Sequence, residues 1–268
     1  MPEGRLMRSL LYVPADQDRF IAKAHLRGAD AVILDLEDSV AEDRKDFARS
    51  NLGEAVKSLR QGSGAVAVRI NSGVEADVAA ALGAGVDLLV FPKANSVAAV
   101  DELDTMMRRH GGEEIPVLGT IESPAGVLDA AAICRHPRLQ AINLGSEDFA
   151  LELGGMPDPD VLRVPKLLVH YAAKAAGKRS LGLLRSIADY ADMEAIAEAA
   201  REARRHGFDG ATCVHPSAVP LLNAAFAPSV AEIEWARAVM TTEGTVSLDG
   251  KMIDKPLRDR AAAILRQV

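Results

Sequence analysis

The sequence predicts an α/β protein built as a (β/α)8 TIM barrel with a C-terminal helical extension. The main observation is that short, continuous apolar runs alternate with stretches of helical periodicity, as in a parallel sheet whose two faces are both buried. The runs number eight within about 220 residues, which suits a closed barrel. The chain has 268 residues, 49% of them hydrophobic, so a large core is possible.

The predicted strands have similar lengths and recur through most of the chain. In order they cover residues 9–14, 31–36, 65–70, 88–93, 115–122, 141–148, 180–186 and 210–216. Helical character lies between them, most clearly in residues 18–28, 44–60, 96–110 and 192–207. This alternation indicates βα units joined in series.

Glycines lie in three of the expected helix-to-strand connections. GAD at 28–30, GVD at 85–87 and GFDG at 207–210 precede the second, fourth and eighth strands, and each glycine suits a helix C-cap. The alternative is an open, doubly wound sheet. It is disfavoured because no glycine-rich phosphate loop follows the first strand.

The chain divides at about residue 228. We expect residues 1–228 to form the barrel, without a linker or a shorter repeat. Residues 229–268 exceed what a barrel needs and predict two helices around a polar turn at 241–251.

The composition of the chain indicates which partners the protein binds and in which compartment it lies. A net charge of −7 and 4% aromatic residues argue against nucleic acid. No apolar run approaches the length that crosses a bilayer, and the N-terminus lacks a signal-peptide pattern, so we expect a cytoplasmic protein without a membrane partner. Cys134 and Cys213 lie in apolar settings, which argues against a disulfide framework or a thiolate metal site.

Charged and polar residues gather at the carboxyl ends of the predicted strands, where barrel enzymes place their chemistry. They are Asp16, Asp35, Glu37, Asp38, Arg69, Asn71, Lys93, Glu122, Glu147, Asp148 and His215. The amino ends are mainly small or apolar. Since solubility alone would spread charge over the helices, this pattern favours a functional rim.

Two of these carboxylates predict a metal site. Glu122 follows the fifth strand and Asp148 the sixth, and consecutive strands of a barrel are neighbours. Carboxylates without thiolate or imidazole suit Mg²⁺, or Mn²⁺. The alternative is that each caps a helix. Arg69 on the same rim suits a bidentate pair with a substrate carboxylate, or else an ion pair with Glu37 or Asp38.

The other rim residues have two interpretations each. We expect Glu37 and Asp38 to orient metal-bound waters or Arg69. Lys45 suits a pair with that acidic cluster. Lys93 suits either a Schiff-base lysine or, more simply, an ion pair. His215 contacts a ligand or is structural.

The order of several motifs resembles the citrate lyase β-subunit-like family of the HpcH/HpaI aldolase/citrate lyase superfamily. That superfamily comprises metal-dependent 2-oxo-acid aldolases and includes malyl-CoA lyases. The matching segments are LYVPAD (11–16), DLEDSV (35–40), VRIN (68–71), FPKANS (91–96), IESPAG (121–126), LGSEDFALELG (144–154), VHPSAV (214–219) and GKMIDKP (250–256).

The resemblance implies a barrel that assembles as a trimer or hexamer, with Mg²⁺ at the positions of Glu122 and Asp148. It implies that Arg69 binds the oxo-acid portion. It also implies that Asp254 of GKMID reaches from the C-terminal extension into a neighbouring subunit's site and acts there as general acid–base.

The resemblance further implies how a thioester is held. Arg19 and Lys23 match positions near CoA phosphates, and His215 is expected to contact substrate or CoA. The first loop departs from the family in carrying Asp16 and Asp18, whose charge disfavours a nearby phosphate. A second departure is Glu147, which adds negative charge beside the metal.

The implied activity is a Mg²⁺-dependent carbon–carbon lyase. It would cleave or form a 3-hydroxy-acyl-CoA thioester that bears a carboxylate, giving an acetyl-CoA-like thioester and a 2-oxo acid. One alternative is a citrate lyase β subunit that acts on an acyl-carrier thioester. Another is a CoA-independent 2-oxo-acid aldolase. It ranks last because that subclass usually has a catalytic His–Asp pair on an early loop. Here His25 precedes DLEDSV, and no histidine lies on the loop that follows it. The segment 180–192 also departs from the family and is expected to shape the pocket.

Overall fold

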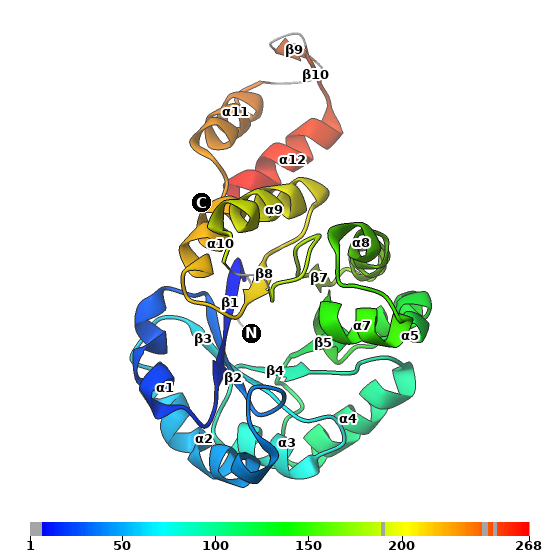
Figure 1. The fold of residues 1–268 in the computed structure, drawn as a ribbon. Helices are drawn as coiled ribbons and strands as arrows, with labels where there is room; N and C mark the ends of the chain where they lie inside the picture. The colour runs from blue at the N-terminus through cyan, green and yellow to red at the C-terminus, as the bar shows by residue number, and fades with distance from the viewer. Residues whose placement is uncertain (1–6, 189–190, 243–245, 249–250, 268) are drawn as a thin grey trace.

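Eight parallel strands form one curled sheet in the order β7-β6-β5-β4-β3-β2-β1-β8 (Figure 1). The computed structural model describes residues 7–188, 191–242, 246–248 and 251–267. A parallel bridge between Leu181 and Gly210 joins the two edges of the sheet, next to β7 and β8. The arrangement is TIM-barrel-like, as predicted. The strands are β1 Ser9–Pro14, β2 Ala31–Asp35, β3 Ala65–Arg69, β4 Leu88–Phe91, β5 Val117–Ile121, β6 Leu139–Leu144, β7 Arg179–Ser180 and β8 Ala211–Cys213.

Helices follow the strands and lie outside the sheet (Figure 1). The first half of the chain contributes α1 Asp18–Ala24, η1 His25–Arg27, η2 Glu42–Arg44, α2 Lys45–Leu59, α3 Glu75–Gly83 and α4 Val97–Arg109. The second half contributes α5 Pro124–Leu128, α6 Ala130–Cys134, α7 Ser146–Leu153, α8 Pro159–Ala175, α9 Met193–His206 and α10 Ala218–Phe226.

The predicted strand ends differ most from the observed ones at the last three strands. The sixth strand ends at Leu144 and not at 148, because Ser146, Glu147 and Asp148 form the first turn of α7. Acidic residues in a first helical turn are stabilised by the helix dipole, which favours the helix here. The seventh and eighth strands are also shorter than predicted, covering Arg179–Ser180 and Ala211–Cys213.

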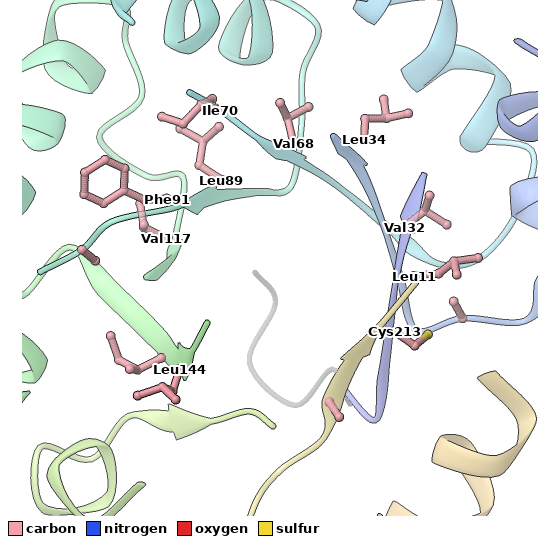
Figure 2. Close-up of a cluster of buried hydrophobic side chains, with 14 of the residues drawn as sticks. Leu11, Val32, Leu34, Val68, Ile70, Leu89, Phe91, Val117, Leu144 and Cys213 are labelled. Carbon is pink, nitrogen blue, oxygen red and sulfur yellow. The ribbon is translucent and has the colours of Figure 1, made fainter. Parts of the chain in front are cut away.

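Side chains alternate along each strand between the helix-facing side and the barrel interior. Figure 2 shows one part of the helix-facing set, with Leu11, Val32, Leu34, Val68 and Leu89 packed in one buried cluster. The interior set forms a second cluster of Leu10, Ala31, Ile33, Ala65, Ala67, Leu88, Val90, Leu118, Ala141, Leu181 and Met7. Side chains therefore fill the interior, as they do in barrels of this size.

Two of the three predicted glycine C-caps are confirmed, Gly28 of η1 and Gly207 of α9, whereas Gly85 directly follows Ala84, the C-cap of α3. Gly28, Gly85 and Gly207 have φ values of 71°, 74° and 95°. In this left-handed region a glycine ends a helix without the steric cost that a Cβ would add.

The C-terminal extension contains more than two helices around a turn. It comprises α11 Val230–Met240, the antiparallel pair β9 Val246–Leu248 and β10 Lys251–Ile253, and α12 Lys255–Leu265. Residues 243–245 and 249–250 of the predicted turn lie outside the described residues. The extension has its own small core, which includes Ala236, Val239 and Ile264. It stands out from the barrel beyond α9 and α10 (Figure 1). The boundary at 228 and packing on a neighbouring subunit stay predictions.

An ion pair connects the extension to the barrel. Arg204 of α9 lies 2.8 Å from Glu232 of α11, and Glu232 also completes a capping box with Ser229. Among the described helices, none combines the length and the apolar character that a bilayer crossing requires.

We predict that Glu232→Gln lowers stability at neutral pH. Burial acts to raise the pKa of Glu232, but hydrogen bonds from Arg204 and Ser229 outweigh it and lower the pKa to about 2. A lowered carboxyl pKa stabilises the fold above the unfolded value of 4.5, and this contribution is lost as pH falls toward 2. We expect a loss of roughly 1 kcal/mol at pH 7 that shrinks below pH 4.5.

The measurement is thermal unfolding of both proteins across this pH range. Glu234→Gln is the matched control, because Glu234 lies exposed on the same helix. An equal shift for both variants would contradict the role of Glu232.

Candidate active site at the carboxyl ends of the strands

The inward-facing positions change from apolar to polar at the carboxyl ends of the strands. On β2 the inward series runs Ala31, Ile33 and Asp35, and on β3 it runs through Ala67 to Arg69. Asp35 and Arg69 are register partners on these adjacent strands. The corresponding polar residues of the other strands are Tyr12, Thr120, Asn143 and Thr212, and all six line one cavity.

Asp35 and Arg69 form a bidentate ion pair in this layer. Arg69 Nε donates to Asp35 Oδ1 at 2.6 Å and Nη2 donates to Oδ2 at 2.7 Å. The Asp35 side chain is 1% exposed and that of Arg69 is 16% exposed. Burial acts to raise the pKa of Asp35, but the hydrogen bonds and charge of Arg69 outweigh it and hold the pKa below its usual value.

Two further carboxylates surround the same guanidinium. Arg69 Nη1 lies 2.9 Å from Glu37 Oε2 and donates to Asp38 Oδ2 at 3.1 Å. The guanidinium also lies over the Tyr12 ring, 4.9 Å from its centroid. The predicted ion pair of Arg69 with Glu37 and Asp38 is therefore present. Its main partner is Asp35, which the sequence placed on the same rim but did not predict as a partner of Arg69.

Glu122 is buried at the end of β5, and the backbone fixes its orientation. Its N–H donates to Asn95 Oδ1 at 2.8 Å, and its Oε2 accepts from the Lys93 N–H at 3.1 Å. Lys93 has a φ of 54°, which is uncommon for a residue with a side chain. In this conformation the Lys93 N–H points toward the Glu122 carboxylate.

Gly145 brings Glu122 close to the start of α7, which carries Asp148. A Cβ at Gly145 would lie 2.6 Å from Glu122 Cγ, so the carboxylate packs where only glycine fits. Burial, followed by the charges of Glu37 and Asp148, raises the pKa of Glu122 to about 8. The structure thus brings the two predicted metal ligands together, although Asp148 lies on a helix and not on a strand.

Glu122, Asp148 and Arg69 line a cavity of about 410 Å³. Thr120 Oγ1 and Asn143 Oδ1 in its wall are buried and have no hydrogen-bond partner among the described residues. Within the described ranges, no three His, Cys, Asp or Glu side chains converge as a metal site. Mg²⁺ nevertheless needs only one or two protein carboxylates and takes its other ligands from water and substrate. The all-oxygen donor set fits this ion.

A second cavity of about 520 Å³ adjoins the first and is basic. Arg19, Lys23, Arg27 and His215 line it, and both cavities share Tyr12, Pro14 and Val214. His215 Nδ1 lies 2.6 Å from Ser217 Oγ.

The two aspartates of the first loop have partners outside this second cavity. Asp16 lies 3.5 Å from Arg44, and Asp18 accepts from Asn51. Neither aspartate is among the residues that line the basic cavity. Neither carboxylate therefore adds its negative charge to the wall of the basic cavity.

The two lysines predicted near the rim, Lys45 and Lys93, have different partners. Lys45 Nζ donates to Asn71 at 2.6 Å and lies 3.2 Å from Glu42, so its observed partners lie outside the predicted cluster of Glu37 and Asp38. Lys93 Nζ lies 4.0 Å from Glu37, which supports the ion-pair interpretation.

Glu147 and the loop after β7 shape the acidic cavity. Glu147 accepts a hydrogen bond from Ser186, and this loop contributes Leu183 and Ile187 to the wall. The predicted influence of segment 180–192 on the pocket is confirmed for these residues, while 189–190 lie outside the described residues.

Asp254 is not brought to the cavity of its own chain. It is the N-cap of α12 and accepts from the Leu257 N–H at 3.4 Å. In the described part of the chain, it makes no contact with the cavity residues, and the extension points away from them (Figure 1). Its role at a neighbouring subunit stays a prediction.

A cavity of about 570 Å³, larger than the two already described, lies at the opposite end of the sheet. Leu88 and Ala141, near the amino ends of β4 and β6, line it together with Arg138. Arg138 is already held by Asp104 and by the Glu113 carbonyl. Because barrel enzymes react at the carboxyl ends of their strands, size alone does not make this cavity the active site.

The fold and the acidic rim are typical of TIM-barrel-like enzymes whose carboxylates are able to hold a metal ion. A sequence comparison specifies the family: the pattern of the HpcH/HpaI aldolase/citrate lyase family matches residues 8–216. The chain belongs to this family, and it is an enzyme of the lyase class.

Individual relatives cover nearly the whole chain. A (3S)-malyl-CoA thioesterase of Cereibacter sphaeroides is 32% identical and aligns over 92% of this chain and 89% of its own. A citrate lyase subunit beta-like protein of Mycobacterium tuberculosis is 34% identical over 96% of this chain and 94% of its own. The crystal structure of protein CitE from Mycobacterium tuberculosis with magnesium, acetoacetate and coenzyme A superposes with a TM-score of 0.79. It shares 32% identity and covers 98% of each chain.

We predict that Asp35→Asn is much more destabilising than Asp38→Asn. Both aspartates contact Arg69, but Asp35 is 1% exposed and Asp38 is 66% exposed. Removing the buried charge leaves the guanidinium buried without its main counter-charge, which lowers the free energy of unfolding by about 3 kcal/mol. Loss of an exposed partner lowers it by less than about 1 kcal/mol. Urea denaturation measures both values, and similar losses would contradict the central role of Asp35.

Proposed function

We propose that the protein is a Mg²⁺-dependent lyase that cleaves or forms a carboxylate-bearing 3-hydroxy-acyl-CoA thioester. The products of cleavage would be an acetyl-CoA-like thioester and a 2-oxo acid. The observation that carries this proposal is the junction of an acidic cavity with a basic one. The first suits a metal and an oxo acid, and the second suits the phosphates of a CoA thioester.

In the acidic cavity, Glu122 and Asp148 would hold the metal, with Mn²⁺ as a substitute. The ion would act as a Lewis acid at the oxygens of the oxo-acid half. Asn143 Oδ1 and Thr120 Oγ1, which lack partners, are further oxygens available to the hydrated ion or to the substrate. The magnesium in the CitE complex supports this assignment.

Arg69 would supply a fixed positive charge where negative charge develops. Three of its five N–H groups donate to Asp35 and Asp38, so these carboxylates orient the guanidinium before substrate binds. Preorganised donors of this kind contribute roughly 3 kcal/mol to transition-state stabilisation. We expect Arg69 to act on the substrate through the N–H groups that remain.

Proton transfer requires a group that takes the hydroxyl proton and one that protonates the new methyl carbon. Glu37 suits the first role, because burial raises its pKa to about 7 despite the nearby charge of Arg69. Asp38 is more exposed and would orient Arg69 and water. Asp254 of an adjacent subunit would protonate the carbon, which requires a trimer or hexamer.

In the basic cavity, Arg19 and Lys23 would contact the phosphates of CoA or of a carrier-bound phosphopantetheine, with His215 nearby. The coenzyme A in the CitE complex supports a thioester partner. A second candidate reaction, hydrolysis of the thioester bond, is favoured by the relative named (3S)-malyl-CoA thioesterase. The two reactions differ in the bond that breaks.

We predict that purified protein with Mg²⁺ cleaves at least one of malyl-CoA, citramalyl-CoA and citryl-CoA, and that EDTA abolishes the reaction. Product analysis distinguishes the candidates. Lyase activity releases a 2-oxo acid and keeps the thioester, whereas hydrolysis releases free CoA and a hydroxy acid. Inactivity on all three, with activity on a carrier-protein thioester or on free 2-oxo acids, would contradict the CoA proposal in favour of those alternatives.

In the same assay, Glu122→Ala and Asp148→Ala should each lower turnover by at least roughly 100-fold. Glu114→Ala is the control, because Glu114 lies at the opposite end of the sheet. Full activity of Asp148→Ala would refute the metal assignment.

We also predict that metal-free protein loses stability as pH rises. Because the pKa of Glu122 is raised from 4.5 to about 8, the folded state binds a proton that the unfolded state has released, and stability falls across this interval. From pH 6 to pH 8 we expect the melting temperature in EDTA to drop by roughly 2–4 °C.

Mg²⁺ should restore more stability at pH 8 than at pH 6, because metal binding requires the ionised carboxylate. Glu122→Gln should show a smaller pH dependence and a smaller response to Mg²⁺. A wild-type melting temperature that is insensitive to both would contradict this account of Glu122.

A further inference from the structure

Helix α8 buries a lysine within an otherwise uncharged stripe. The buried residues of α8 follow the helical period and are Leu162, Pro165, Lys166, Val169, His170 and Ala173. Lys166 is 4% exposed. Lysine is almost never buried to this extent unless it is paired, so this residue requires an explanation.

No partner for Lys166 exists in the described part of the chain. The other polar member of the stripe, His170, lies 3.0 Å from the His206 carbonyl and stacks on Phe208. The buried Arg138 is bound to Asp104. The Lys166 ammonium, by contrast, forms no hydrogen bond or ion pair with any described residue. The charge of the exposed Glu147 acts on it without forming an ion pair.

Lys166 lines the same cavity as Glu122, Asp148 and Arg69. Burial lowers the pKa of Lys166 to about 8, so the ammonium form still predominates at neutral pH. An ammonium with three unused donors in the wall of a cavity is a site for an anion.

The other cation of the cavity wall is already committed. Arg69 is bound to Asp35 and Asp38 and lies 2.9 Å from Glu37. Arg69 therefore already shares its charge with three protein carboxylates before any substrate arrives. An incoming carboxylate would find in Lys166 a desolvated cation that is paired with none of the described carboxylates.

We propose that Lys166 binds a carboxylate of the oxo-acid half of the substrate. This inference rests on the proposed function, because it takes the anion in the cavity to be a 2-oxo acid. Two carboxylates satisfy the same chemistry: the one beside the oxo group, which every 2-oxo acid has, and the distal one of a dicarboxylic oxo acid such as oxaloacetate.

The test is direct binding in the presence of Mg²⁺, measured by titration calorimetry with pyruvate and with oxaloacetate. Lys166→Met keeps the apolar stem and removes the charge, and it should weaken binding by roughly 10- to 100-fold. Lys166→Arg should recover part of the loss. If the affinities for both acids fall equally, Lys166 contacts the carboxylate beside the oxo group. If only the affinity for oxaloacetate falls, Lys166 contacts the distal carboxylate.

Lys174→Met is the matched control. Lys174 lies on the same helix but pairs with Asp209 at 2.7 Å, and it does not line the cavity. Its loss should leave both affinities unchanged. Mn²⁺ affinity without oxo acid, followed by electron paramagnetic resonance, should be undiminished in Lys166→Met, and the melting temperature should not fall. A merely structural lysine would lower the melting temperature and leave oxo-acid affinity intact.

The outcomes separate this inference from the proposed function. If the wild-type protein binds neither acid with Mg²⁺, the proposed function fails. If it binds them and Lys166→Met binds them equally well, the function stands and the role of Lys166 is refuted.

Discussion

The site depends on the buried ion pair between Asp35 and Arg69. It joins two neighbouring strands at their last inward positions, where a guanidinium alone would be too costly to desolvate. Because the pair is bidentate, it also fixes the plane of the guanidinium. Glu37, Asp38 and Tyr12 then assemble around a charge whose position is already set.

The rest of the site follows from how the barrel interior is divided. Its apolar side chains, such as Ile33 and Leu118, exclude water from the middle of the sheet. Above them the same strands present carboxylates and amides to a cavity of limited volume. Burial there raises the pKa of Glu37 and Glu122, so their charged forms need a compensating cation. A divalent metal would meet this need on one side of the cavity, and Lys166 adds positive charge from α8.

Much of the fold could be predicted from local pattern. All eight strands were located, and β1 was placed with the observed ends, because a buried parallel strand is a continuous apolar run. Glu122, Asp148 and Arg69 were recognised from their positions after such runs. The predictions were wrong where a strand changes into a helix without an apolar signal, as at Gly145. They also missed the antiparallel strands β9 and β10 between α11 and α12. Lys166 had a detectable signal, a charge within the apolar stripe of a helix, but that helix was not among those predicted.

By itself, the sequence determined the class of fold, the series of βα units and the residue types at each strand end, because hydrophobic periodicity and turn residues act locally. Only the tertiary structure decided which of those residues meet. Asp35 and Arg69 are 34 positions apart, and their pairing is a consequence of the register between β2 and β3. Burial raises the pKa of Glu122 and removes Lys166 from solvent. This burial likewise arises from elements that are distant in the chain. Desolvation and charge proximity are properties of the packed molecule, and no local pattern encodes them.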